Sequence, residues 1–327
     1  RQAYLAGAGR GRPLDSGRSG VLESAPRENR PTSCGKRLAA RDDVPPWESI
    51  RRFVPRPIRR RGWTVLKFLA AQWAITKANF ARLAESPPGP IPLPPPRLRF
   101  RVSGGAVARE FLASGERSAS DLRAALRHVK RDIYSFRRIL DFGCGCGRVV
   151  RWFHDHPVDC SLYGTDIDAQ AIRWCQKKLT FATFLPNGPL PPLPFPDETF
   201  DLVYSISIFT HLDESYQMAW LRELKRVIQP GGFALLTFHG ESNWSDLSPE
   251  ELATLQGAGF YYKVSITGSL KRDGLTDFYQ AAYHTERYVV ETCGRLFRVH
   301  RFLDKGLENY QSIAVLERDD GRAGGAG

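Results

Sequence analysis

Three glycines at alternating positions, Gly143, Gly145 and Gly147, follow a short apolar run. Glycine lets the backbone turn sharply from a strand into a helix and lets a ligand approach the main chain closely. Asp141 precedes the first glycine by two residues, and Asp166 ends a second apolar run 19 residues after the third. An acidic side chain in that place can accept hydrogen bonds from both ribose hydroxyls of an adenosine. The pattern predicts a site for an adenosine-containing cofactor.

The glycine spacing distinguishes between classes of cofactor. A dinucleotide fold requires GxGxxG, and its third glycine would fall at position 148, which is Arg148. Arginine fits poorly where helix and strand must pack closely, so a nicotinamide-dependent oxidoreductase is the weaker alternative. The sequence contains no GxxxxGK[ST] motif, which excludes a Walker-type nucleotide site.

An alternation of apolar strands and amphipathic helices must position these residues. Such alternation is typical of a doubly wound, mostly parallel α/β sheet with helices on both faces. In the segment 213–228, apolar residues recur at helical spacing after Asp213, which can cap a helix. The predicted helices are 106–114, 118–130, 147–155, 168–179 and 213–228, and the predicted strands are 139–141, 161–166, 181–185, 201–209 and 232–238.

The last part of the chain has a different pattern. Residues 284–293 are predicted as a helix, and two strands, 296–303 and 311–317, follow it with a short polar turn between them. This pattern predicts a C-terminal antiparallel hairpin that completes a seven-stranded sheet. Residues 240–283 are rich in aromatic side chains and do not fit the alternation, so we expect an insert that lies over the active site.

The positive charge of the chain is concentrated at its start. The net charge is +12, of which residues 1–61 contribute +9. These residues are rich in Arg, Gly, Pro and Ser and are predicted to form a basic, disordered tail. Residues 62–100 are predicted as a helix (63–84) followed by a stiff proline-rich linker, and residues 101–320 as the main domain. The basicity belongs to the tail, so the pI does not indicate nucleic-acid binding by the whole chain.

The apolar runs and the cysteines indicate the cellular environment of the chain. No stretch of 18 or more apolar residues occurs, and peripheral membrane contact through residues 59–84 is the weaker expectation because their apolar core is short. The six cysteines are too irregularly spaced for a disulfide framework, which favours a reduced, cytoplasmic setting. Cys144 and Cys146 lack a partner pair with zinc-ligand spacing, so we expect packing residues and no metal.

Residues 139–148 resemble motif I of class I S-adenosylmethionine-dependent methyltransferases. Three further stretches resemble later parts of that family in the right order: 163–168, 193–203 and 221–232. The resemblance implies a Rossmann-like methyltransferase fold and methyl transfer from S-adenosylmethionine to a small molecule. The chain is most similar to bacterial small-molecule methyltransferases, which makes a hydroxyl of a glycan or secondary metabolite the expected acceptor.

The resemblance also implies roles for individual residues. Asp141 would hold the amino group of the cofactor, and Asp166 would hold its ribose hydroxyls. Ile167 would pack on the adenine, and Asn187 would accept a hydrogen bond from the adenine amino group. The implied cofactor-binding set is Asp141, Gly143, Gly145, Gly147, Asp166, Ile167, Asn187 and Ser205.

A hydroxyl acceptor benefits from a general base, whereas a neutral amine needs none. His211 and His239 follow predicted strands at the cofactor edge and are the candidate catalytic bases, with a pKa near 6.5 if unperturbed. His284 is expected to cap a helix. A methyltransferase-like protein that binds the cofactor without turnover is an alternative. Nucleic-acid methylation is disfavoured, because residues 207–210 read Ser-Ile-Phe-Thr where many base-methylating enzymes carry Asn-Pro-Pro-Tyr.

Overall fold

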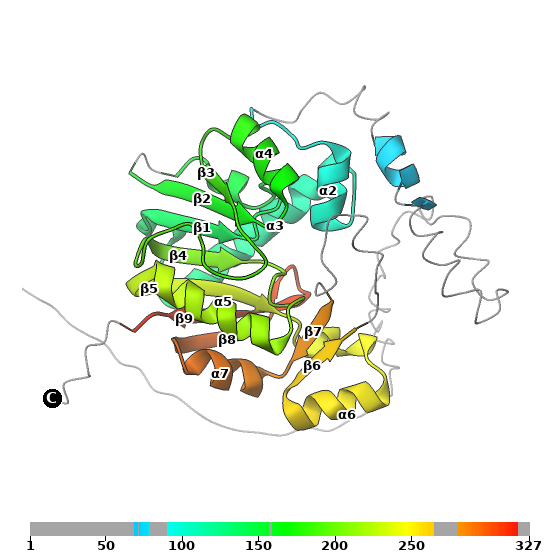
Figure 1. Cartoon of the computed structure of the whole chain (residues 1–327), viewed down its shortest axis with the longest axis vertical. Helices are drawn as coiled ribbons and strands as arrows, with labels where there is room; N and C mark the ends of the chain where they lie inside the picture. Colours follow the sequence, from blue (N-terminus) through cyan, green and yellow to red (C-terminus); the bar gives the residue numbers. More distant parts are fainter. Residues whose placement is uncertain (1–68, 71, 79–89, 157–158, 265–279, 320–327) are drawn as a thin grey trace, which may run out of the picture. The chain divides into compact units, whose positions relative to one another are not determined.

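The computed structural model describes residues 69–70, 72–78, 90–156, 159–264 and 280–319, and the predicted tail 1–61 lies outside these ranges. A seven-stranded sheet with strand order β3-β2-β1-β4-β5-β9-β8 forms the centre of the described part (Figure 1). Its strands are β1 (Arg138–Phe142), β2 (Ser161–Asp166), β3 (Thr183–Pro186), β4 (Phe200–Ser205), β5 (Ile228–Phe238), β8 (Arg298–Leu307) and β9 (Gln311–Glu317).

The first five strands of this sheet run parallel to one another. Strand β1 pairs with β2 and β4, β2 pairs with β3, and β4 pairs with β5. Strand β9 is antiparallel to both β5 and β8. The predicted doubly wound sheet with a C-terminal antiparallel hairpin is therefore confirmed. The carboxyl ends of β1, β2 and β4 meet at one edge, where such sheets bind their ligands.

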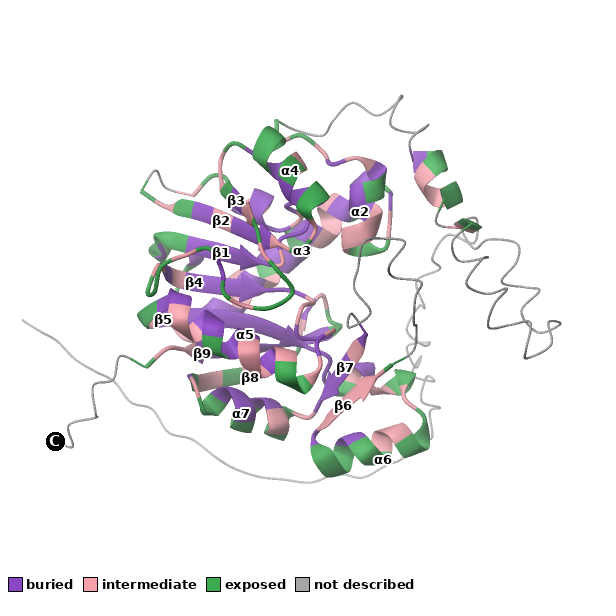
Figure 2. Cartoon of the chain, viewed as in Figure 1, coloured by how far each residue is buried: buried purple, intermediate pink, exposed green. Residues whose placement is uncertain are grey.

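Successive residues of the central strands alternate between two buried hydrophobic layers. Ile139 packs with Leu202 on one side of the sheet, and Leu140 packs with Val203 on the other. Figure 2 shows the central strands β1, β4, β5 and β9 as mostly buried, whereas the edge strand β8 is half-buried or exposed and the helices expose their outer sides. This two-sided burial is typical of a parallel sheet that is covered on both faces.

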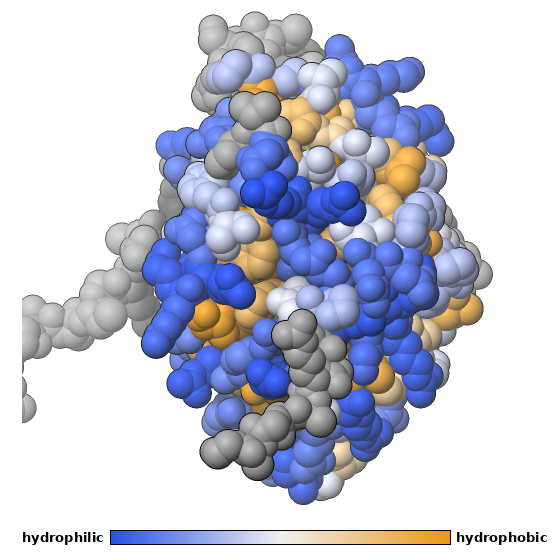
Figure 3. All heavy atoms as spheres, turned by 90° about the vertical axis from the view of Figure 1, so that its left-hand side faces the viewer, coloured by the Kyte–Doolittle hydropathy of each residue, from blue (hydrophilic) through white to orange (hydrophobic). Residues whose placement is uncertain are grey.

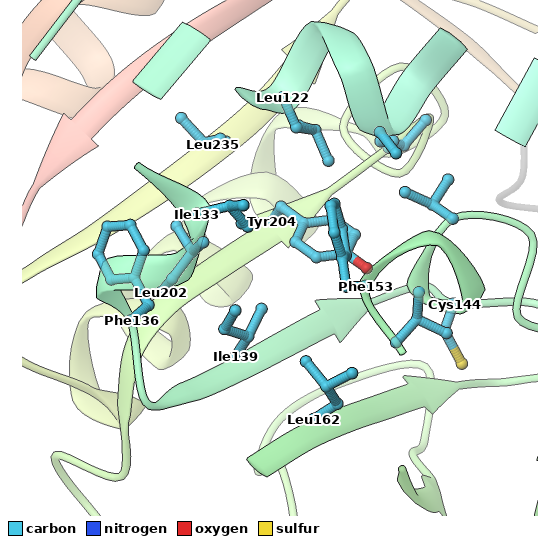
Figure 4. Close-up of a cluster of buried hydrophobic side chains, with 14 of the residues drawn as sticks. Leu122, Ile133, Phe136, Ile139, Cys144, Phe153, Leu162, Leu202, Tyr204 and Leu235 are labelled. Atoms are coloured by element: carbon cyan, nitrogen blue, oxygen red, sulfur yellow. The ribbon is translucent and has the colours of Figure 1, made fainter. Parts of the chain in front are cut away.

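The covering helices divide between the two faces. The first face is covered by α3 (Ala108–Arg127) and α4 (Ala169–Lys178), and Figure 4 shows its core around Tyr204. The second face is covered by α5 (Glu214–Val227) and α7 (Glu286–Gly294). Helix α5 begins as predicted, since the Asp213 side chain accepts a hydrogen bond from the N–H of Tyr216.

Helix α3 corrects the prediction of two helices at 106–114 and 118–130. The helix continues through Gly115, although glycine costs a helix interior about 1 kcal/mol relative to alanine. A Cβ atom at Gly115 would lie 2.2 Å from the carbonyl oxygen of Arg148. Glycine therefore allows the helix to approach the backbone of the glycine loop and does not interrupt it.

Two other predicted elements are shorter in the structure. The helix predicted at 147–155 is only a 3-10 turn, Val150–Phe153. Pro157 follows closely in the sequence, and a proline disfavours the helical conformation of the residue before it, here His156. The strand predicted at 201–209 ends at Ser205, and Ser207 adopts a left-handed φ of 58° that no strand accommodates.

A helix also replaces the end of the predicted linker. Helix α2 (Pro96–Ser103) begins with proline, which is well suited to the first helical position. It crosses the boundary expected between residues 100 and 101 and packs against the main domain. Of the helix predicted at 63–84, residues 69–70 and 72–78 are helical and the rest lies outside the described residues.

The insert after β5 contains regular structure. It consists of a 3-10 turn (Glu241–Asp246), helix α6 (Pro249–Ala258), and the antiparallel pair β6 (Phe260–Lys263) and β7 (Ala281–His284). Residues 265–279, between these strands, lie outside the described part. Backbone hydrogen bonds join β7 and the residue before it to the main domain. The amides of residues 280 and 282 donate to the carbonyls of His211 and Thr210, and the amide of residue 284 donates to the carbonyl of His239.

The surface away from the site is polar. Figure 3 shows the side of the molecule at the amino ends of the parallel strands, where hydrophilic residues prevail and hydrophobic ones form small separate areas. Among the described residues, no helix combines the length and the hydropathy needed to cross a membrane.

Candidate active site

A cavity of about 140 Å³ lies at the carboxyl edge of the parallel strands. Strands β1 and β2, the glycine loop, the loop after β4, helix α2 and helix α5 all contribute to its wall. The structure brings six of the eight predicted cofactor residues together in this wall: Asp141, Gly143, Gly145, Asp166, Ile167 and Asn187.

The glycine loop is held by its own backbone amides. Gly143 and Gly145 adopt left-handed φ values of 86° and 54°, which side-chain-bearing residues rarely adopt. The amides of Gly143 and Cys144 donate to the Thr165 carbonyl, and the amide of Gly145 donates to the Asp166 carboxylate at 2.7 Å. The loop is thereby fixed to the end of β2.

The Asp166 carboxylate is partly buried and has two backbone donors. Besides Gly145, the amide of Asp168 donates to its second oxygen at 2.7 Å. Burial raises the pKa of Asp166, and these two N–H groups oppose the shift. Each carboxylate oxygen has a further lone pair, so the group can still accept hydrogen bonds from a ligand.

Asp141 titrates close to neutrality. Its side chain is only 3% exposed, and burial raises its pKa to about 7. The Tyr204 hydroxyl and the Arg148 guanidinium act in the opposite direction and lower this pKa. A small change of environment therefore decides whether the cavity contains a carboxylate or a neutral acid at this position.

The outer part of the cavity offers one amide oxygen and one apolar surface. Asn187 Nδ2 donates to the Gly188 carbonyl, whereas Asn187 Oδ1 is buried and has no hydrogen-bond partner in the described part of the chain. The Ile167 side chain is 38% exposed although it is apolar. An unfilled acceptor beside an exposed apolar side chain fits an aromatic ring that carries an amino group.

Two predicted cofactor residues lie outside the cavity wall. A Cβ atom at Gly147 would lie 2.4 Å from the Leu179 side chain, so this glycine makes room for the end of α4. Ser205 is fully buried within the sheet at the end of β4. The wall is formed instead by Ile206, Ser207 and Ile208, because the chain turns immediately after Ser205.

Sequence reasoning missed Arg101 and Val102, which enter the wall from helix α2. Val102 packs on the glycine loop, since a Cβ atom at Gly145 would lie 2.5 Å from it. The sequence feature that could have indicated this helix is the segment 96–103, which begins with proline and contains three arginines. Trp220 of α5, predicted only as a core residue, also borders the cavity.

Arg148, at the position where a dinucleotide fold has glycine, belongs to a partly buried network. Its guanidinium donates to the hydroxyls of Ser114 and Ser118 and forms an ion pair with Glu308 at 3.2 Å. The last hairpin is thereby joined to the glycine loop. In a dinucleotide fold the third glycine allows close packing at this position. Here Gly115 of α3 has that role, because it allows α3 to approach the backbone of Arg148.

The two candidate bases lie side by side at the carboxyl ends of β4 and β5. The ring centroids of His211 and His239 are 6.1 Å apart, and neither ring lines the cavity. His211 Nδ1 is 2.6 Å from the Gln280 carbonyl oxygen, and His239 Nδ1 is 3.2 Å from that of Ala282. A carbonyl only accepts, so both Nδ1 atoms carry the proton and both Nε2 atoms are unprotonated in the neutral rings.

Burial keeps these rings uncharged. It lowers the pKa of His211 to about 4 and that of His239 to about 4. His284 is not the predicted helix cap, since it ends β7 and the Thr285 side chain caps α7. His284 is fully buried and contacts the Gln217 side chain, which indicates a structural role.

Ser207, in the cavity wall, forms hydrogen bonds with residues of β5 and β9. The Gln311 side chain donates to the Ser207 hydroxyl at 2.9 Å, and the amide of Ser207 donates to Thr237 Oγ1 at 2.8 Å. Phe238 of β5 lies opposite Ser312 of the antiparallel strand β9. His239 follows Phe238 and Gln311 precedes Ser312, so the register places these two residues next to this pair. Hydroxyl, amide and imidazole groups therefore lie at this part of the edge, and the Asp304 carboxylate accepts a hydrogen bond from Ser312 close by.

The cysteines near the glycine loop are packing residues. Cys144 and Cys146 are buried in separate hydrophobic clusters. Within the described ranges, no group of three or more histidine, cysteine, aspartate or glutamate side chains has the arrangement of a metal site.

Comparison with known proteins identifies the domain. Residues 139–232 match the family described as a methyltransferase domain. An uncharacterized methyltransferase of Schizosaccharomyces pombe is 31% identical over 33% of this chain and 40% of its own length. A fatty-acid O-methyltransferase of Mycolicibacterium smegmatis is 30% identical over 31% of this chain and 36% of its own length. The chain thus spans two fifths or less of these relatives.

One solved structure matches a larger part of the chain. The S-adenosylmethionine-dependent methyltransferase of Mesorhizobium loti covers 60% of this chain and 96% of its own, with 18% identity and a TM-score of 0.42.

Proposed function

Since this chain belongs to the class I S-adenosylmethionine-dependent methyltransferases, we propose that it moves the methyl group of that cofactor onto a hydroxyl of a small-molecule acceptor. One observation carries the proposal: the cofactor cavity and a pair of neutral imidazoles lie at the same edge of the sheet. The first provides a methyl donor site, and the second provides groups that can accept a proton.

The cavity residues have unfilled hydrogen-bonding capacity that suits this cofactor. The remaining lone pairs of Asp166 accept from the ribose hydroxyls, and Asn187 Oδ1 accepts from the adenine amino group. The Asp141 carboxylate pairs with the ammonium of the methionine part. When bound, S-adenosylmethionine supplies a methyl group on a positively charged sulfur and leaves as a neutral thioether.

Alignment is the main contribution of the protein to such a displacement, because the charge on sulfur disperses and little new charge forms. Ile206, Ser207 and Ile208 form the wall between cofactor and acceptor, so they fix the line of approach. The left-handed φ of Ser207 is a local strain, and such strain is retained where the surrounding structure requires it.

The unprotonated Nε2 of His239 or of His211 takes the proton of the acceptor hydroxyl. With a pKa of about 4, each imidazole is a weak base. Proton transfer is most efficient when donor and acceptor pKa values are close, so an acidic hydroxyl is favoured. We therefore expect a phenolic acceptor in preference to an alkanol.

The experiment is methyl transfer by the purified chain, measured by mass spectrometry as the gain of one methyl group. The matched probes are methyl 4-hydroxybenzoate, which offers only a phenol, and decanoate, which offers only a carboxylate. We expect methylation of the phenol. Methylation of decanoate alone would indicate a carboxylate acceptor, which is ionised at neutral pH and needs no base. S-adenosylhomocysteine binding without any turnover would support the non-catalytic alternative.

A further inference from the structure

We infer that Asn243, in the 3-10 turn after β5, binds a carboxamide substituent of the acceptor and thereby selects phenols that carry this group. The inference rests on the proposed function, because it concerns the acceptor of the same reaction. It gives the first turn of the insert a role in substrate specificity.

The Asn243 side chain has unfilled hydrogen-bonding capacity. It is 1% exposed, and neither its Oδ1 nor its Nδ2 has a hydrogen-bond partner in the described part of the chain. Within the described ranges, no other buried side chain leaves two polar atoms unpaired in this way. A buried polar atom without a partner is costly, so the two atoms point to a group that arrives with a ligand.

The turn that carries Asn243 folds back onto the residues around His239. The backbone amide of Asn243 donates at 3.0 Å to the carbonyl of Gly240, which directly follows His239. The Ser242 hydroxyl donates to the Tyr310 carbonyl at 2.8 Å, and the centroids of the Tyr310 and His239 rings are 6.1 Å apart. The turn also contacts β7 and β8. The backbone of Asn243 is therefore held close to the candidate base.

Two tyrosine rings next to His239 suit a flat acceptor. The Tyr283 ring lies 5.4 Å from the His239 ring and is tilted by 36° to it, and the Tyr310 ring meets it at 73°. Tyr310 is 51% exposed, whereas Tyr283 is 4% exposed, so a ligand approaches His239 from the side of Tyr310. Aromatic rings pack well against one another in tilted and edge-to-face arrangements. This surrounding favours an aromatic acceptor such as a phenol.

The two unpaired atoms of Asn243 select the substituent of that phenol. A primary carboxamide offers the complementary pair, a carbonyl oxygen that accepts and an N–H that donates. The match holds for both orientations of the Asn243 amide, because exchanging its oxygen and nitrogen still leaves one acceptor and one donor. An ester or a carboxylate only accepts, so it leaves the side-chain oxygen without a donor. A site of this kind rejects an analogue that lacks the N–H, because its own polar atom then stays unpaired.

The test compares phenols that differ in one substituent. 4-Hydroxybenzamide and methyl 4-hydroxybenzoate carry a carboxamide and an ester at the same position, and the 3-substituted pair provides a second spacing. The value of kcat/KM for methyl transfer is measured with the wild type, Asn243→Leu and the control Ser245→Ala, which replaces an exposed residue of the same turn. We expect the wild type to favour the amide of at least one pair by about 10- to 100-fold, as for one unpaired buried polar atom.

Asn243→Leu should reduce this ratio of amide to ester to about one, whereas Ser245→Ala should keep it. Leucine is close to asparagine in shape and leaves no polar atom unpaired, and the affinity for S-adenosylhomocysteine checks that the variant folds. Equal use of amide and ester by the wild type would overturn the inference, as for an Asn243 that only binds water. A preference that Asn243→Leu retains would overturn it as well, because another residue would then bind the amide. Absence of methyl transfer to all four phenols would instead contradict the proposed function.

Discussion

The two halves of the sheet edge use opposite chemistry. The half at β1 and β2 is charged, with Asp141, Asp166 and Arg101 in the cavity wall. The half at β4, β5 and β9 is neutral, because burial keeps His211 and His239 unprotonated. The charged half suits the amino-acid part of S-adenosylmethionine, and the half with the imidazoles suits the hydroxyl acceptor that we propose. In the function that we propose, one sheet edge thus separates the charged ligand from the weak base.

Loss of a histidine is expected to have the largest effect. His239→Ala and His211→Ala should each lower kcat by about 10²- to 10⁴-fold if that ring is the base, while S-adenosylhomocysteine affinity stays unchanged. The assay is methyl transfer to the phenolic probe, and the exposed His128→Ala is the matched control. Full activity in both variants would remove base catalysis from the neutral half and favour alignment alone.

Asp166→Ala tests the charged half. It should weaken binding of S-adenosylhomocysteine by about 1.5–3 kcal/mol, the usual contribution of hydrogen bonds to a charged group. Titration calorimetry measures the effect, and Asp155→Ala, on an exposed residue, serves as control. Unchanged affinity in a folded variant would show that Asp166 only fixes the glycine loop through Gly145.

The pH dependence of the two halves should differ. Asp141 has a pKa of about 7, so below that pH it is protonated and no longer attracts the cofactor ammonium. Affinity for S-adenosylhomocysteine should fall by up to about tenfold per pH unit below pH 7, and Asp141→Asn should flatten this profile. The histidines, with a pKa of about 4, should not contribute there. A loss of kcat near pH 6.5 at saturating cofactor would contradict this separation.

The smallest effect is expected at the connection between the halves. Glu308→Gln removes the charge that Arg148 faces but keeps a group that can bind Ser118. It should lower the free energy of unfolding by about 1 kcal/mol, since the pair is partly exposed. Urea denaturation measures the change. A much larger loss, with loss of cofactor binding, would show that the hairpin holds the glycine loop in place.

Local sequence patterns predicted the glycine loop, the acidic end of β2 and helix α5, because each of these depends on residues close together in the chain. Glycine spacing indicated the loop, and an acidic strand end indicated Asp166, because each role needs a particular residue type at a particular place. Helix α5 was equally predictable from its cap and its apolar period.

Other features depend on residues far apart in the chain. Gly115 suggested a break in a helix, since its contact with the Arg148 carbonyl is invisible in the sequence. Arg101 was placed at the start of the main domain without a role in the site, because only the folded chain brings α2 onto the glycine loop. Ser205 was chosen in place of Ser207, since a strand pattern does not show where the chain turns out of the sheet.

The ion pair of Glu308 with Arg148 has a consequence for synthesis of the chain. The ribosome makes the glycine loop first and Glu308 about 160 residues later. Until the final hairpin has emerged, Arg148 lacks its counter-charge and β5 lacks its neighbour β9. A nascent chain that stops before residue 308 therefore has every glycine of the motif but an incomplete setting for it. Quality control of this protein should depend on its last strands, although the chemistry is encoded near its middle.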